Sequence, residues 1–138
     1  MRFMGIDLGT RNIGVAVSDE SCTIAQGRDV VKRTSDKEAA DEIASMACRY
    51  GVSGIVVGLP VNMDGSEGER AEDARKFASL LENVSGIDVT LFDERLSTKE
   101  AEDILILADM SRAKRRRVID KMAAQLILQT YLDMRLKG

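Results

Sequence analysis

Residues 4–19 read MGIDLGTRNIGVAVSD, two apolar runs that are separated by a glycine turn and interrupted by one carboxylate, Asp7. Successive side chains of a β-strand point to opposite faces of a sheet, so Phe3, Gly5 and Asp7 share one face of the first run. A carboxylate on a face that normally packs is costly to bury unless it is paired, hydrogen-bonded or bound to a cation. Asp7 is therefore the first candidate for a functional residue.

The composition narrows the class of protein. The chain has 138 residues, of which 44% are hydrophobic, and we expect a single domain over residues 1–138. No apolar run approaches the ~20 residues of a membrane-spanning helix, and the first residues lack the layout of a signal peptide. We expect a soluble, cytoplasmic protein without a membrane partner. Histidine is absent, which excludes Ser-His-Asp and Cys-His sites and leaves carboxylates, lysines, hydroxyls or a metal for any catalysis.

The hydrophobic periodicity predicts five strands and four helices. The strands are expected over residues 2–8, 13–19, 24–31, 54–58 and 87–92, and the helices over 36–50, 67–83, 98–108 and 118–136. Ser-x-x-Glu capping boxes at Ser35, Ser66 and Ser97 mark the first three helix starts. The order βββαβαβαα predicts an α/β fold of the ribonuclease H-like type, with a five-stranded mixed sheet and helices on both faces.

Acidic residues gather where this topology brings strand ends together. Asp7 ends the first strand, Asp93 and Glu94 end the fifth, and Asp120 is expected in the first turn of the last helix, on the same side as Ala123. Clustered carboxylates repel one another unless cations neutralise them, and oxygen ligands without imidazole suit Mg²⁺ or Mn²⁺. Such ions support phosphodiester hydrolysis. Each carboxylate taken singly also has an ordinary explanation as a helix-dipole partner, a solvated strand end or a turn cap.

Two further segments are candidates for phosphate contacts. Five positive charges lie in a predicted loop ahead of Asp120, within a chain whose net charge is −3; they are Arg112, Lys114, Arg115, Arg116 and Arg117. The alternative is a solvated charge run at a helix start. The loop over residues 58–66 follows a buried strand, and its amides together with Ser66 could hold a phosphate. The alternative there is a Pro/Gly turn with a helix cap.

Four motifs in order resemble one bacterial family. They are Gly5-Ile-Asp-Leu-Gly9 with Ile13-Gly-Val-Ala-Val-Ser-Asp19, Val57-Gly-Leu-Pro60 with Asn62-Met-Asp-Gly-Ser66, Asp93-Glu-Arg-Leu-Ser-Thr98, and Val118-Ile-Asp-Lys-Met-Ala-Ala124. The chain resembles the YqgF family, also called RuvX, of pre-16S rRNA nucleases that were first proposed as Holliday junction resolvases. The resemblance implies a ribonuclease H-like fold and a catalytic metal site for Mg²⁺ or Mn²⁺ on Asp7, Glu94 and Asp120, with Asp93 left open as a further ligand.

The expected function is metal-dependent cleavage in 5′-end maturation of pre-16S rRNA, with ribosomal precursor particles as a partner and a monomer or homodimer as the assembly. The residues assigned to nucleic-acid binding are Arg11, Asn62, Ser66, Arg95, Lys114, Arg115, Arg116 and Arg117. Relatives often carry a basic pair where this chain has Arg11-Asn12, which leaves one phosphate contact in question. The alternatives are a Holliday junction resolvase acting on branched DNA and a non-catalytic nucleic-acid-binding module. An actin-like ATPase fits poorly, because a second phosphate loop is missing.

Overall fold

The protein is described by a computed structural model over residues 1–96 and 112–137, with the side chains of residues 119–135 in its last helix. The elements in chain order are β1 (Arg2–Leu8), β2 (Asn12–Ser18), β3 (Ala25–Lys32), α1 (Asp36–Tyr50), β4 (Val52–Leu59), α2 (Glu69–Ser85), β5 (Asp88–Asp93), the 3₁₀ turn η1 (Glu94–Leu96) and α4 (Arg112–Lys137). All five predicted strands are confirmed to within two residues. The helix predicted over 98–108 and its capping box at Ser97 lie outside the described residues.

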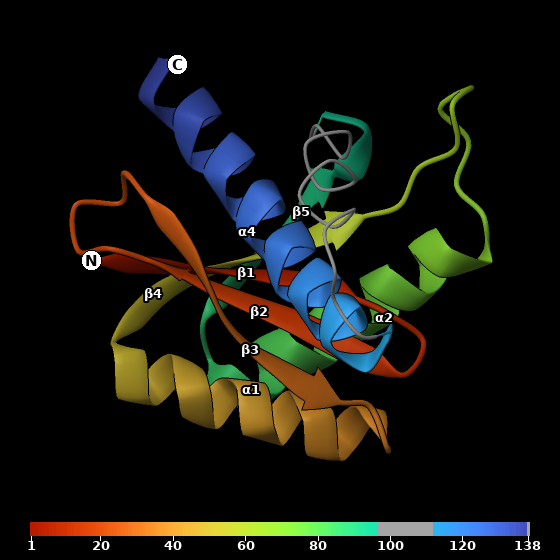
Figure 1. The fold of residues 1–138 in the computed structure, drawn as a ribbon, viewed down its shortest axis with the longest axis horizontal. Helices are drawn as coiled ribbons and strands as arrows, with labels where there is room; N and C mark the ends of the chain where they lie inside the picture. Colours follow the sequence, from red (N-terminus) through yellow and green to blue (C-terminus); the bar gives the residue numbers. More distant parts are fainter. Residues whose placement is uncertain (97–111, 138) are drawn as a thin grey trace.

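The strands form one sheet in the order β3-β2-β1-β4-β5. β1, β2 and β3 pair antiparallel in sequence, whereas β4 and β5 continue the sheet from β1 in parallel pairings. Figure 1 shows α4 crossing one face of the sheet, with α1 and α2 on the other. This arrangement confirms the predicted α/β fold. Within the described part of the chain, no helix has the length and apolar character needed to cross a membrane.

Large aliphatic side chains build the sheet face under α1 and α2. Met4, Ile6 and Leu8 of β1 enter this core together with alternate residues of β2 and β4. Complete burial of such a side chain contributes about 1.5–3 kcal/mol, so this face is a main source of stability. α1 begins as predicted, because the hydroxyl of Ser35 accepts a hydrogen bond from the amide of Glu38 at 3.1 Å.

Glycines occupy several positions of the sheet face under α4, beside buried side chains such as Val56 and Phe92. A Cβ atom at Gly5 would lie 2.6 Å from Cβ of Leu128, and one at Gly27 would lie 2.9 Å from the carbonyl oxygen of Lys121. The helix axis therefore runs closer to the sheet than larger residues would allow. The side chains of Gln125 and Gln129 accept hydrogen bonds from the β3 amides of Gly27 and Ala25, both at 2.9 Å. These contacts fix α4 relative to β3.

The last helix begins at Arg112 and not near residue 118, so the prediction of a basic loop over residues 112–117 is wrong. The backbone of this run is helical. Arg and Lys are good helix formers, and no glycine or proline in the run stops the helix from extending toward its amino end. Asp120 consequently lies in the third turn of α4, beyond the first-turn position that the sequence predicted.

The second helix also begins later than predicted, at Glu69, and its N-cap is Gly68. The capping box at Ser66 is therefore wrong. The hydroxyl and the amide of Ser66 donate to Oδ1 of Asp64 at 2.6 and 2.9 Å. An aspartate readily accepts hydrogen bonds from the residue two positions on, and this local turn takes the serine that would have capped the helix.

Candidate nucleic-acid and metal site

Asp7 lies half-buried near the carboxyl end of β1, on the sheet face that α4 crosses. Its partner in β2 is Gly14, and the parallel register that places Ile6 beside Val57 brings Gly58 of β4 next to it. Neighbouring strands lie about 4.8 Å apart. Because neither glycine has a side chain, the space on both flanks of Asp7 is available to groups from other elements.

Asp120 of α4 lies over the first flank. A Cβ atom at Gly14 would overlap the carbonyl oxygen of Asp120, so the helix backbone passes directly above this glycine. The neighbouring Ala124 is fully buried on the same side of the helix. Burial raises the pKa of the Asp120 carboxyl, because its charged form loses solvation by water. A cation in this place would favour the charged form.

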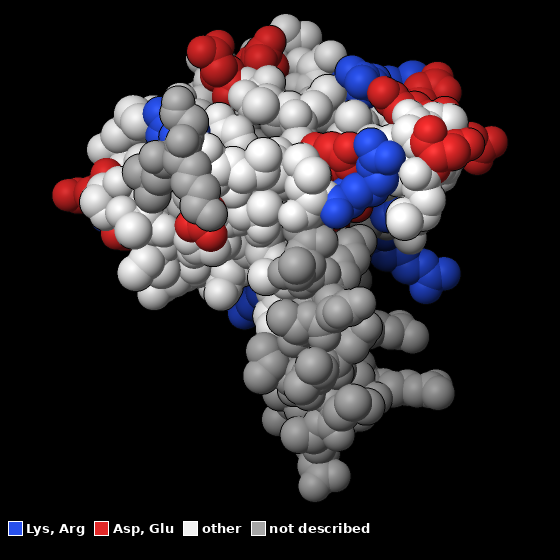
Figure 2. All heavy atoms as spheres, turned by 90° about the horizontal axis from the view of Figure 1, so that it is seen from above, with Lys and Arg blue, Asp and Glu red and all other residues white. Residues whose placement is uncertain are grey.

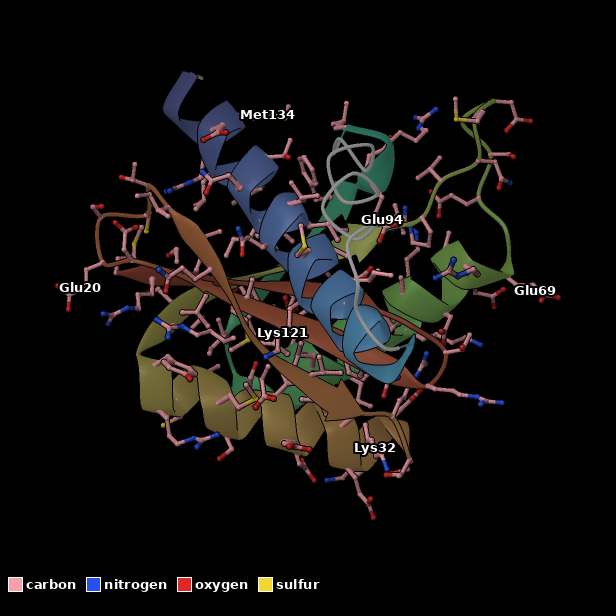
Figure 3. The ribbon with its side chains drawn as sticks, in the orientation of Figure 1. Glu20, Lys32, Glu69, Glu94, Lys121 and Met134 are labelled. Atoms are coloured by element: carbon pink, nitrogen blue, oxygen red, sulfur yellow. The ribbon has the colours of Figure 1, made fainter. Side chains whose placement is uncertain are left out.

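Glu94 of η1 lies over the second flank. A Cβ atom at Gly58 would be 2.6 Å from Oε1 of Glu94 and 2.7 Å from Cδ1 of Ile127 in α4. Strand alternation explains this position: Phe92 packs into the core beneath α4, and Glu94 follows two residues later on the same face. Figure 3 shows Glu94 at this end of the sheet, beside α4. Asp120, Asp7 and Glu94 thus form a row across β2, β1 and β4.

Asp93 has a different environment from its neighbour Glu94. Nε and Nη2 of Arg95 donate to Oδ2 of Asp93 at 3.0 and 2.7 Å, and the amide of Arg95 donates to Oδ1 at 2.9 Å. The guanidinium lowers the pKa of the Asp93 carboxyl. Arg95 also reaches the carbonyl oxygens of Asn62 and Met63 at 3.4 Å. Asp93 and Arg95 therefore hold the adjacent loop, whereas Glu94 lies over Gly58.

A hollow of about 480 Å³ opens at this edge of the sheet. It is lined by Asp7, Gly9, Thr10, Arg11, Asn12, Arg70, Ile119 and Asp120. The predicted carboxylates Asp7 and Asp120 therefore border one space together with the predicted cation Arg11. Arg70, in the first turn of α2, was missed by the sequence analysis. Its only signal was a positive charge at a helix start, which is more often a solvated residue.

Three amides of the loop between β4 and α2 already have partners within the loop. The amides of Asn62, Gly65 and Ser66 donate to Ser66 O, Asn62 O and the Asp64 carboxylate, respectively. The side-chain amide of Asn62 donates to the hydroxyl of Ser66 at 3.0 Å. The carboxylate of Asp64 thus accepts the hydrogen bonds of Ser66 that a phosphate was expected to accept. The assignment of Asn62 and Ser66 to phosphate binding stays a prediction, and it would require these contacts within the loop to be exchanged for the ligand.

The basic run leads along the first turns of α4 toward Asp120. The side chains of Lys114, Arg115, Arg116 and Arg117 lie outside the described residues, so their assignment to nucleic-acid binding stays a prediction. Elsewhere, acidic and basic side chains are mixed on the side of the molecule where β4 and α2 are joined, at the right of Figure 2. That part of the surface offers no single-sign patch.

The acidic residues of the row formed by Asp120, Asp7 and Glu94 offer oxygen ligands, which suit Mg²⁺ or Mn²⁺. Among residues 1–96 and 112–137, no three His, Cys, Asp or Glu side chains are close enough together to hold a metal by themselves. Mg²⁺ usually keeps several waters and is bound through one or two carboxylates and substrate phosphates. Asp7 and Asp120, which border one hollow, fit a hydrated ion of this kind.

The architecture first defines a class of protein. The structure resembles RuvC of Thermus thermophilus with a TM-score of 0.58 at 16% identity, over 99% of this chain and 97% of that one. It resembles the fowlpox virus resolvase, solved with Holliday junction DNA, with a TM-score of 0.58 at 14% identity over 99% of both chains. The fold is therefore that of the RuvC-like, ribonuclease H-like resolvases.

The sequence comparisons identify the family. The family model described as "RuvX: Holliday junction resolvase" matches residues 1–134, and the chain belongs to this family. A "Putative pre-16S rRNA nuclease" of Myxococcus xanthus is 56% identical over 96% of this chain and 88% of its own length. One of the same description from Bacillus pumilus is 49% identical over 96% of this chain and 98% of its own. The chain is thus a nuclease in class, a hydrolase that acts on phosphodiester bonds.

Proposed function

We propose that the row of Asp120, Asp7 and Glu94 is the catalytic site of a nuclease that depends on Mg²⁺ or Mn²⁺. The observation that carries the proposal is the placement of these residues around Asp7: Asp7 and Asp120 line one hollow, and Oε1 of Glu94 lies over Gly58 in the neighbouring strand. In this proposal, acidic residues from three elements that are distant in the sequence act together at one edge of the sheet. This edge is where open α/β sheets bind their ligands.

The residues have separate roles in this proposal. Asp7 and Asp120 would hold the ion from two sides of the hollow, and Glu94 would hold a second ion or orient water at the neighbouring strand end. When bound, the metal would stabilise the charge that develops on the phosphate and lower the pKa of water. Arg11 and Arg70 border the same hollow and would bind the phosphates that flank the cut.

The substrate we propose is the 5′ end of pre-16S rRNA, in the cytoplasm and on ribosomal precursor particles. The support is that relatives with this description are about half identical over nearly all of the chain, as for the protein of Myxococcus xanthus at 56%. The two solved resolvases, RuvC of Thermus thermophilus and the fowlpox virus enzyme, share only the fold with this chain, at 14–16% identity. Substrate choice follows the surface side chains, which diverge long before a fold does.

The test compares cleavage of a pre-16S rRNA fragment and a four-way DNA junction, with Mg²⁺ or Mn²⁺. The wild type should cut the RNA at its 5′ maturation site, and Asp7→Asn should lower the rate by about 10²-fold or more, as the loss of a preorganised electrostatic group does. The matched control is Asp88→Asn, an exposed aspartate at the opposite end of the sheet, which should keep full activity.

Faster cleavage of the junction than of the RNA would overturn the substrate assignment. Full activity of Asp7→Asn would remove Asp7 from the site. Metal binding is measured separately from cleavage: Mg²⁺ or Mn²⁺ should raise the Tm of the wild type and of Asp88→Asn, and much less that of Asp7→Asn, because a ligand of the folded state stabilises it. Equal shifts in all three proteins would place the metal elsewhere.

A further inference from the structure

Arg33 follows β3 and is almost completely buried, with 10% of its side chain exposed. Its guanidinium binds two acidic side chains: Nη1 and Nη2 donate to both carboxylate oxygens of Asp73 in α2 at 2.8 and 2.7 Å, and Nε donates to Oδ1 of Asp36 in α1 at 2.8 Å. The ring of Phe77 lies 5.8 Å from Cζ. The planar fork of an arginine suits such bidentate and stacked contacts, which a lysine cannot reproduce.

The same residue also holds the turn between β1 and β2, which forms one rim of the hollow. Nη1 of Arg33 donates to the carbonyl oxygen of Gly9 at 3.0 Å, and the amide of Arg33 donates to the carbonyl oxygen of Arg11 at 2.8 Å. Within the turn, the amide of Gly9 donates to the carbonyl oxygen of Asn12 at 3.0 Å. Arg33 therefore fixes two carbonyl groups of a four-residue turn whose side chains line the hollow.

The opposite rim is the start of α2, and Arg33 holds that as well. Asp73 lies three residues after Arg70, so the two side chains are neighbours on one side of the helix. Their proximity is also reflected in the pKa of the Asp73 carboxyl, which is lowered first by Arg33 and to a smaller extent by the charge of Arg70. The guanidinium thus joins the turn that carries Arg11 to the helical turn that carries Arg70.

We propose that Arg33 is a positioning residue of the nucleic-acid site: by binding Gly9 O, Arg11 O and Asp73 together, it sets the spacing of Arg11 and Arg70 across the hollow. This inference rests on the proposed nuclease function, because it assigns the two spaced cations to the substrate's phosphates. Arg33 lies on the other side of the rims and does not line the hollow. Its effect on the reaction is therefore transmitted through the turn and α2.

The test is Arg33→Lys, which keeps the positive charge and removes the planar guanidinium with its paired N–H donors. Misplacement of binding groups by about 1 Å lowers efficiency by up to about 10²-fold, so we expect kcat/KM on the pre-16S rRNA fragment to fall about 10- to 100-fold, mainly through KM. Hydrogen exchange at the amides of Gly9 and residue 33, followed by NMR, should become faster. The matched control is Arg75→Lys, since Arg75 forms an exposed bidentate pair with Glu67, at 2.7 and 2.8 Å, away from the hollow.

A second variant distinguishes the effect of Arg33 on the α2 rim from its effect on the turn, and it controls for a general loss of structure. Asp73→Asn keeps the contacts of Arg33 with Gly9 and Asp36, so KM should rise while exchange at the Gly9 amide stays as in the wild type. The inference is overturned if Arg33→Lys matches Arg75→Lys in both KM and amide exchange, or if its loss of activity lies in kcat alone. A wild type that cuts no nucleic acid would instead overturn the proposed function on which the inference rests.

Discussion

The two faces of the sheet are built from alternate residues of the same strands, yet they differ in kind. Under α1 and α2 the strands present Met, Ile, Leu and Val side chains that are almost fully buried. Under α4 the same strands present Gly5, Gly14 and Gly58, and the helix backbone or a carboxylate fills the space. Both faces stabilise the fold by burial, and on the second face the missing side chains also let α4 and Glu94 approach the strands next to Asp7. Because alternate residues of a strand face opposite sides of the sheet, the same strands build both faces with different residues.

The largest expected effect is a difference in cleavage rate between variants of two adjacent acidic residues, Asp93 and Glu94, which have different surroundings. Glu94→Gln should lower metal-dependent cleavage by about 10²-fold or more, because Glu94 lies over Gly58 in the carboxylate row. Asp93→Asn should leave the rate within a few-fold of the wild type, because Asp93 is held by Arg95. Single-turnover rates of both variants, at saturating metal, check this. An inactive Asp93→Asn with an active Glu94→Gln would reverse the assignment.

The next effect concerns the close approach of α4. Gly14→Ala places a methyl group against the carbonyl group of Asp120, and such overpacking should lower the free energy of unfolding by about 1–3 kcal/mol. Because the helix must move, cleavage should fall as well. Gly68→Ala is the control, since its added atom would meet nothing nearer than Asn62 Nδ2 at 3.8 Å. Urea unfolding measures both variants, and equal midpoints would show that α4 does not need the glycine.

The basic run at the start of α4 should affect binding and not chemistry. Replacing Arg115, Arg116 and Arg117 by Ala should weaken RNA binding and reduce the slope of log K against log salt by roughly 0.7 for each lost single-strand phosphate contact. The rate at saturating RNA should recover. Fluorescence anisotropy between low and high salt gives the slope. An unchanged slope would make the run the solvated start of a helix.

The smallest effect is a difference in pH dependence between the two faces. Arg33 lowers the pKa of Asp73, so this carboxyl stabilises the fold above its ordinary pKa of about 3.9, and that contribution is lost as the pH falls through the lowered value. Burial raises the pKa of Asp120, so the metal-free protein loses stability as the pH rises through 3.9 and the raised value. At pH 7, Asp73→Asn should lower Tm and Asp120→Asn should raise it, each by a few degrees.

Thermal melts without metal at pH 7 and at a pH below 3 check both signs, because the remaining carboxylates are common to all proteins compared. Both differences should shrink toward low pH. A destabilised Asp120→Asn at pH 7 would mean that its charged form is already well paired in the metal-free protein.

The sequence by itself determined the features that depend on neighbouring residues. Alternation placed Asp7 on the opposite face from Ile6, and the Ser35 box marked the start of α1. Such features can be predicted from the sequence because side chains repeat their direction every two residues in a strand and about every 3.6 residues in a helix. The choice between Asp93 and Glu94 stayed open in the sequence, and the burial of Phe92 under α4 shows which of the two shares its face.

Only the tertiary structure decided the features in which competing partners come from distant segments. Ser66 was free to cap α2 or to bind Asp64, and it binds Asp64. Arg33 finds Asp73 across 40 residues of sequence, and Arg70 reaches the hollow because α2 is held there. No periodicity records such contacts. They follow from the packing of helices against the sheet, where the space left by a glycine and the depth of a buried charge are set by the whole fold.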